Sequence, residues 1–142
     1  MLINLDDCLK KGLIKKTAPS KEQALASIDK AKKLLEEAKA DLEDERYNSA
    51  TVIGYLSILN ASKALLYKDG YREKSHMCVT RFIEAKYGDK LPKDTIHLLD
   101  HFRETRHEIQ YDVDHYADKE SSKEIVEFAN EFVNLIEDLT EA

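Results

Sequence analysis

The chain has 142 residues and a formal net charge of −6, and hydrophobic residues make up 42 % of it and charged residues 35 %. This length predicts a single domain over residues 1–142 with a core over residues 21–139, and the composition excludes a fibrous or disordered chain. The negative net charge argues against a protein that coats nucleic acid, because such proteins usually carry a positively charged surface.

The first part of the chain predicts a short helix and then a long one. Four glycines and two prolines leave few places where a helix would break. We expect a short helix over residues 3–16, weakened at Gly12 and ended at Thr17-Ala-Pro19. A capping box, Ser20-Lys-Glu-Gln23, opens the second helix. Apolar residues then recur at spacings of three and four to about Glu45, which indicates one buried stripe.

The most apolar segment follows and predicts the central helix of the fold. It begins with Asn48 or Ser49 as the cap and runs to Lys68. Its apolar residues fall on more than one side, so we expect it to be packed on several faces. Asp69-Gly70 is a typical stop signal for a helix.

The second half predicts three more helices. One covers residues 75–86, and Pro92 stands near the first position of the next, which continues through Ile109. Residues 112–119 are polar and irregular, and a second capping box at Ser121-Ser-Lys-Glu124 opens the last helix. The whole pattern predicts an all-α, up-and-down antiparallel bundle of four to five main helices plus a short N-terminal helix.

Two Glu-x-x-His pairs, Glu73/His76 and Glu104/His107, raise the question of a metal site. Di-iron bundles use two such pairs together with a glutamate from each of two other helices. Glu73 falls in a connection, and the central helix contains no glutamate. We therefore expect neither a metal nor another cofactor.

The cysteines and the hydropathy pattern bear on location. Cys8 and Cys78 show no CxxC or metal-binding spacing, so two free thiols in a reducing cytoplasm are expected. No signal peptide and no apolar run of membrane-spanning length is evident, so the expected location is cytoplasmic with no membrane contact.

The segment Arg103–Asp112 carries the candidate site. On a helix, Arg103, Arg106 and Gln110 share one face, and His107 lies one turn from both Arg103 and Tyr111. Guanidinium groups bind phosphate in a bidentate way, and imidazole transfers protons near neutral pH. These residues predict a site that binds phosphate or cleaves a phosphodiester without metal. The alternative is an ordinary polar helix end in which the arginines pair with neighbouring glutamates.

Two stretches in this order resemble the HEPN superfamily, small α-helical bundle proteins widespread in prokaryotes. The first is Tyr55–Gly70 followed by Lys74-Ser-His76, and the second is Arg106-His-Glu-Ile-Gln-Tyr-Asp112 followed by the capped last helix. The resemblance covers residues 21–139. It implies a bundle of four to five helices that forms homodimers and that often pairs with a minimal nucleotidyltransferase in toxin–antitoxin modules.

The resemblance also identifies site residues. Catalytic members of the superfamily are RNases in which an arginine is followed, after four to six residues, by a histidine. Here three residues separate Arg103 from His107 and eight separate Arg106 from His115, while Tyr111 stands at the histidine position. The sequence is similar to the branch with an arginine followed by an Asp/Gln-Tyr pair, and Arg106 is the family arginine.

Three functions follow as expectations. The first is a dimeric interaction module that binds a nucleotide through Arg103, Arg106 and Gln110 or that pairs with a minimal nucleotidyltransferase. The second is a metal-independent endoribonuclease toxin that acts on RNA with Arg106, His107 and Tyr111 as catalytic residues. The third is a purely structural bundle.

Overall fold

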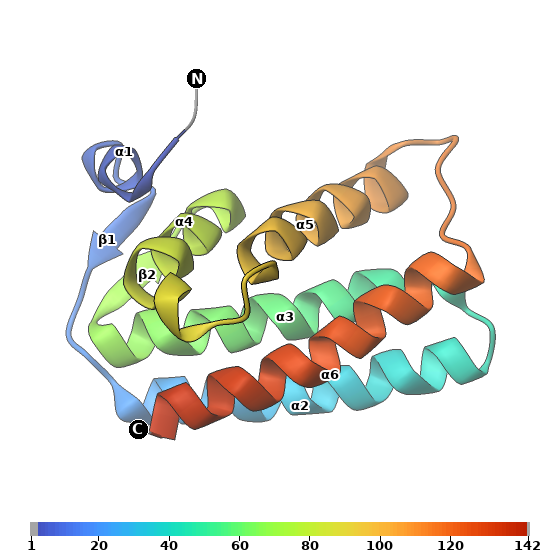
Figure 1. Cartoon of the computed structure of the whole chain (residues 1–142), viewed down its shortest axis with the longest axis horizontal. Helices are drawn as coiled ribbons and strands as arrows, with labels where there is room; N and C mark the ends of the chain where they lie inside the picture. Colours follow the sequence, from blue (N-terminus) through green and yellow to red (C-terminus); the bar gives the residue numbers. More distant parts are fainter. Residues whose placement is uncertain (1–2, 142) are drawn as a thin grey trace.

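Three long helices form the base of the fold, and two shorter ones cover it. The computed structural model describes residues 3–141. Helices α2 (Lys21–Glu43) and α6 (Lys119–Glu141) pack on one side of α3 (Tyr47–Asp69). Helices α4 (His76–Tyr87) and α5 (Thr95–Tyr111) lie on its opposite side (Figure 1). This arrangement confirms the predicted all-α bundle.

Helix α3 is packed on several sides, as its sequence predicts. Small residues let its neighbours approach closely: a Cβ added to Gly54 would lie 3.5 Å from the Ile125 side chain of α6. On the α2 side, the Ser57 hydroxyl donates a 2.7 Å hydrogen bond to the Ala31 carbonyl. On its opposite side α3 also contacts α4 and α5, so it links both layers of the bundle.

The length and composition of α3 also match those of a membrane-spanning helix, which the sequence analysis did not expect. However, 72 % of its apolar window is buried inside the protein. This burial is typical of the core helix of a folded bundle, and no membrane contact follows from it.

The predicted starts of α2 and α4 are correct, whereas the predicted start of α3 is wrong. The Ser20 hydroxyl accepts from the Gln23 amide at 3.1 Å and caps α2. Ser75 caps α4 in the same way. For α3, neither predicted cap residue is used, because the helix begins at Tyr47 without a side-chain cap. The Asn48 side chain instead accepts from the Ala117 amide at 2.7 Å, a contact with a segment distant in sequence.

The last two helices also begin away from their predicted positions. Helix α5 starts at Thr95, after a short 3-10 turn, η1 (Gly88–Lys90), so Pro92 precedes the helix. Helix α6 starts at Lys119, because the Asp118 carboxylate accepts from the Ser121 amide at 2.8 Å and caps it. The predicted capping box from Ser121 therefore lies inside the first turn of α6.

The expected helix over residues 3–16 is wrong beyond its first half. Helix α1 (Leu5–Lys10) ends before Gly12, whose φ of +68° turns the chain out of the helix. Strand β1 (Ile14–Lys16) then pairs antiparallel with β2 (Tyr71–Glu73), with Ile14 opposite Glu73. Residues 3–16, called the N-terminal arm below, therefore lie beside α4 at one end of the bundle (Figure 1).

The expectation of two free thiols is also wrong. Cys8 of α1 and Cys78 of α4 form a disulfide, with their Cα atoms 5.8 Å apart. The two cysteines are 70 positions apart in sequence, and no local motif signals that they pair.

Candidate functional site

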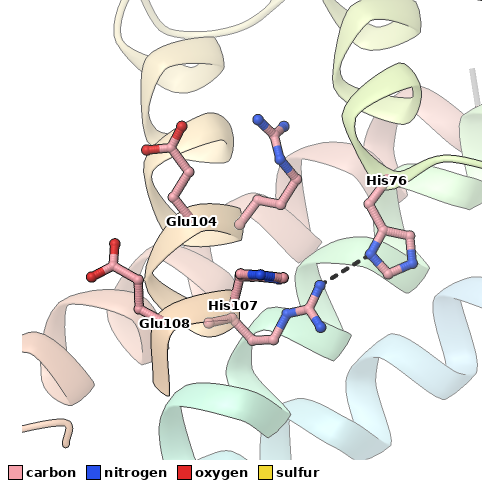
Figure 2. Close-up of a pocket in the computed structure, with 6 residues that line it drawn as sticks. His76, Glu104, His107 and Glu108 are labelled. Carbon is pink, nitrogen blue, oxygen red and sulfur yellow. Dashed lines mark hydrogen bonds between the residues drawn. The ribbon is translucent and has the colours of Figure 1, made fainter. Parts of the chain in front are cut away.

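A groove between α4 and α5 gathers most of the charged residues that the sequence singled out. Its volume is about 460 Å³, and it opens to solvent beside the C-terminal half of α5 (Figure 2). The residues that line it are His76, Arg103, Glu104, Arg106, His107 and Glu108. Five of the six come from one helix, because residues at spacings of three and four share a helix face.

Arg106 lies at the centre of the groove and is held by three uncharged groups. Its Cζ atom is 4.7 Å from the centroid of the Tyr55 ring. Its Nη1 donates to the Gln110 side-chain oxygen at 2.9 Å, and its Nη2 donates to His76 Nδ1 at 3.2 Å. Its Nε is buried without a hydrogen-bond partner. Within residues 3–141, no carboxylate comes within ion-pair distance of this guanidinium.

Arg103 lines the same groove but, unlike Arg106, forms an ion pair. Its Nη1 donates to Asp100 Oδ1 at 2.7 Å, and Arg81 of α4 donates to the other oxygen of that carboxylate at 2.5 Å. The Arg81 and Arg103 side chains are only 14 % and 18 % exposed. Asp100 therefore ties α4 to α5, which fixes the width of the groove.

His76 is the first residue of α4 and the partner of Arg106 from across the groove. Since a guanidinium only donates, His76 Nδ1 must accept, and the ring then carries its hydrogen on Nε2. Burial lowers the pKa of His76 below its usual range, and the positive charge of Arg106 lowers it further. The neutral imidazole is thus the form that supports the contact with Arg106.

Tyr55 of α3 supports Arg106 from the core side. It belongs to the core, with 4 % of its surface exposed, and its ring packs against Arg106. Burial raises the pKa of the Tyr55 phenol, although the neighbouring Arg106 opposes this shift. The phenol therefore stays protonated at neutral pH, and the ring acts as a neutral support for the guanidinium.

The other predicted site residues lie on or beside the groove. His107 lines it on the side of α5 that faces His76, whereas the carboxylates of Glu104 and Glu108 point away from His76 (Figure 2). Tyr111 is 62 % exposed and packs against His107 in a tilted arrangement, with ring centroids 4.7 Å apart and an interplanar angle of 44°, but it does not line the groove.

The family of the chain follows from a comparison with known protein families. The model of the HEPN domain matches residues 24–139. The chain belongs to the HEPN domain family. HEPN domains are in general nucleotide- or RNA-related modules. No curated protein matches the chain significantly.

The matched range divides this HEPN protein into two parts. It begins inside α2 and ends near the end of α6, so it includes every residue of the groove. The N-terminal arm lies outside it, and so does Cys8. Cys78 lies inside it, and the disulfide therefore joins the arm to the HEPN domain.

His76 is the site residue that the sequence analysis did not include. Its sequence context suggested a metal ligand together with Glu73, and Lys74-Ser-His76 formed part of the HEPN resemblance. In the structure, Glu73 forms an ion pair with Lys63 at 3.2 Å, while His76 turns to Arg106. Thirty positions separate His76 from Arg106, so helix periodicity alone does not connect them.

A second cluster ends α5 of the HEPN domain. His115 contacts Glu108 at 3.0 Å and Asp112 at 3.4 Å, one carboxylate at each ring nitrogen. All three side chains are about half exposed, at 51 %, 47 % and 53 %. Both imidazole nitrogens already face carboxylates, so we interpret the cluster as an exposed polar network at the helix end.

Proposed function

We propose that the groove between α4 and α5 binds the phosphate group of a nucleotide or of RNA. The observation that carries this proposal is the Arg106 guanidinium, which is partly buried, lines the groove and has no carboxylate partner within residues 3–141. A guanidinium has five N–H donors, and Arg106 uses two of them for hydrogen bonds within the protein. A phosphate group is a matching bidentate acceptor.

The surroundings of Arg106 support the same proposal. His76, Gln110 and the Tyr55 ring orient the guanidinium without neutralising it. Arg103 adds positive charge to the groove, although Asp100 offsets much of it. With a net charge of −6, the protein would repel a long polyanion elsewhere on its surface. A local contact with one or a few phosphates fits this charge distribution better than a long nucleic-acid track.

Calorimetric titration with inorganic phosphate, AMP, ATP and a short RNA tests the proposal. Arg106→Ala should weaken binding about tenfold or more, since it removes charge-assisted hydrogen bonds. Arg106→Lys should also bind poorly, because an ammonium does not reproduce the bidentate geometry. Arg72→Ala is the matched control: it removes the same charge from an exposed arginine that packs on Tyr67. The proposal fails if Arg106→Ala binds like the Arg72→Ala variant, or if none of the four probes binds.

A second candidate function is metal-independent RNA cleavage with Arg106, His107 and Tyr111. The observation that favours it is that His107 shares the groove with Arg106 and is exposed. An imidazole supplies acid–base catalysis while a guanidinium stabilises the developing charge on phosphorus oxygens. Cleavage in the presence of EDTA by wild type but not by His107→Ala would support it. Tyr111→Phe then tests whether the phenol takes part. If the wild-type protein at micromolar concentration leaves RNA intact, this function is excluded.

The family resemblance also leads us to propose that two copies associate through the exposed segment that follows the groove. Tyr111, Val113 and Tyr116 are 62 %, 85 % and 76 % exposed, which is unusual for apolar side chains so close together. Light scattering should give a dimer mass, and Val113→Asp should shift it toward a monomer. A monomer mass for wild type at high concentration would remove this part of the proposal.

As a second protein partner, we propose a minimal nucleotidyltransferase in a system of the toxin–antitoxin type. Co-expression with the product of a neighbouring nucleotidyltransferase gene tests it. Separate elution of the two proteins, with no shift in thermal stability, would contradict this pairing.

A further inference from the structure

The disulfide joins the N-terminal arm to the first turn of the helix that carries His76. Cys8 lies in α1 and Cys78 is the third residue of α4, and both side chains are fully buried. We propose that Cys8 and Cys78 form a reversible disulfide whose redox state sets the position of His76 in the groove. No part of the HEPN match requires this bridge, because Cys8 lies outside the matched range.

Apart from the disulfide, the N-terminal arm is held by short elements. Helix α1 has six residues, and helices of that length are not stable on their own in water. Strands β1 and β2 have three residues each, and an isolated two-stranded ribbon is marginal as well. Ile14 anchors the strand in the core with 1 % of its surface exposed. For α1 itself the disulfide is the strongest attachment to the bundle.

The contact between the arm and the groove passes through residues 74–78. The Leu13 carbonyl accepts from the Lys74 amide at 2.8 Å, which fixes the residue before Ser75. The Ser75 hydroxyl accepts from the Cys78 amide at 3.3 Å, which caps α4. His76 lies between these two anchor points and accepts from Arg106.

A change in the disulfide therefore reaches the groove directly. When the bridge opens, α1 loses its covalent attachment to Cys78, and the Leu13–Lys74 contact loses the support of α1. The Ser75 hydroxyl still caps α4, but the covalent anchor at Cys78 is gone, so the first turn of the helix frays more readily. His76 is the first residue of that turn, so its contact with Arg106 weakens with it.

The redox step is an ordinary thiol–disulfide exchange with a low-molecular-weight disulfide as the oxidant. One protein thiolate attacks the oxidant, forms a mixed disulfide and releases one thiolate. The second protein thiolate then attacks the mixed disulfide, closes the Cys8–Cys78 bond and releases the other thiolate. The protein loses two electrons and two protons, and the oxidant becomes two thiols. A dithiol reductant reverses the step.

Burial of both sulfur atoms links this exchange to motion of the arm. A reagent cannot reach either sulfur in the closed form, because both cysteines have 0 % exposure. The arm has to open before the bridge is reduced, and its opening is the same motion that exposes the first turn of α4. In a reducing compartment, disulfides are more often transient and redox-sensing than permanent and structural.

Wild-type protein oxidised with glutathione disulfide and then reduced with dithiothreitol tests the proposal. Alkylation and mass measurement should show a bridge in the first form and two thiols in the second. Amide hydrogen exchange of residues 76–79 and of the arm should be about tenfold faster, or more, in the reduced form. Cys8→Ala is the control: it should exchange like reduced wild type and should not respond to the reductant.

Two results would overturn the proposal. One is that both thiols stay free after oxidation. The other is that reduction leaves the exchange of residues 76–79 unchanged. The comparison of the two wild-type forms decides the question even if Cys8→Ala does not fold.

The effect of the bridge on ligand binding rests on the proposed phosphate site and is measured separately. If inorganic phosphate or AMP binds, reduction should weaken its binding several-fold in wild type and should change nothing in Cys8→Ala. Equal affinity in both wild-type forms, despite altered exchange, would overturn the regulatory role of the bridge. If neither probe binds in either form, the phosphate site is wrong, while the exchange data still decide whether the disulfide positions His76.

Discussion

Replacement of Gly70 by alanine tests how the segment Thr17–Pro19, which follows the N-terminal arm, is attached to the end of α3. Gly70 ends α3 with a φ of +86°, a conformation that costs an L-residue with a Cβ about 1–2 kcal/mol. A Cβ at this position would also lie 2.7 Å from the Thr17 carbonyl oxygen and 3.0 Å from the Pro19 ring. Real Cβ atoms do not approach so closely, so the backbone at Thr17 and Pro19 would have to move.

That movement weakens a hydrogen bond. The Gly70 carbonyl accepts from the Thr17 amide at 2.8 Å, and such a bond contributes about 0.5–1.5 kcal/mol. The two effects together predict that Gly70→Ala lowers the free energy of unfolding by about 2–3 kcal/mol. For a chain of this size the melting temperature should fall by roughly 6–12 °C.

Two other glycines separate the contributions. Gly12 has a φ of +68°, but an added Cβ meets only the end of the Lys15 side chain at 3.5 Å, so Gly12→Ala should show the conformational cost alone. Gly88 has a helical φ of −55° and nothing within 4 Å of an added Cβ. Gly88→Ala should therefore be neutral or stabilise by about 0.4–1 kcal/mol.

Denaturant and thermal unfolding followed by circular dichroism at 222 nm give all three values. The reasoning is refuted if Gly70→Ala costs no more than Gly12→Ala, because the approach to Thr17 would then impose no constraint. It is also refuted if Gly88→Ala destabilises the protein as much as Gly70→Ala.

Three further predictions concern the groove and the core. Because the pKa of His76 is lowered in the folded protein, the unfolded chain binds more protons below the ordinary histidine pKa of about 6.5. The free energy of unfolding should thus decline as the pH falls from about 6.5 toward the depressed pKa. The His76→Gln variant, unfolded under the same conditions, should lack this part of the decline. Asp100→Ala leaves Arg81 and Arg103 without their shared carboxylate and should cost about 1–3 kcal/mol in denaturant unfolding, whereas Asp100→Glu should recover part of it. An unchanged midpoint would mean that the network is not stabilising. Phe132→Ala removes a ring that is 1 % exposed and should cost about 3–5 kcal/mol by the same assay; a loss below 1 kcal/mol would contradict its place in the core.

Features that depend on a few consecutive residues were predictable from the sequence. The Ser20 cap, the Gly70 stop and the apolar character of α3 are local, so the number and order of the main helices follow from them. The candidate site was predictable to the same extent, since Arg103, Arg106 and His107 share a short stretch of one helix.

Features that depend on distant partners were not predictable in this way. Ile14 becomes part of a strand because Glu73 lies opposite it, and nothing near Ile14 signals that partner. The predicted cap residue Asn48 bonds to Ala117 instead of its own helix, for the same kind of reason. His76 joins the groove only because the start of α4 packs beside α5.

Tyr55 connects the groove to the interior of the protein. The residue is almost completely buried in α3, the helix that contacts both layers of the bundle, and its ring supports the guanidinium of Arg106. The Arg106 guanidinium in the groove therefore cannot rearrange independently of the core. For the phosphate binding that we propose, the ligand would meet a guanidinium whose orientation was fixed when the chain folded, so little additional ordering would be needed on binding. Preorganisation of this kind allows a groove with few charged contacts to be selective.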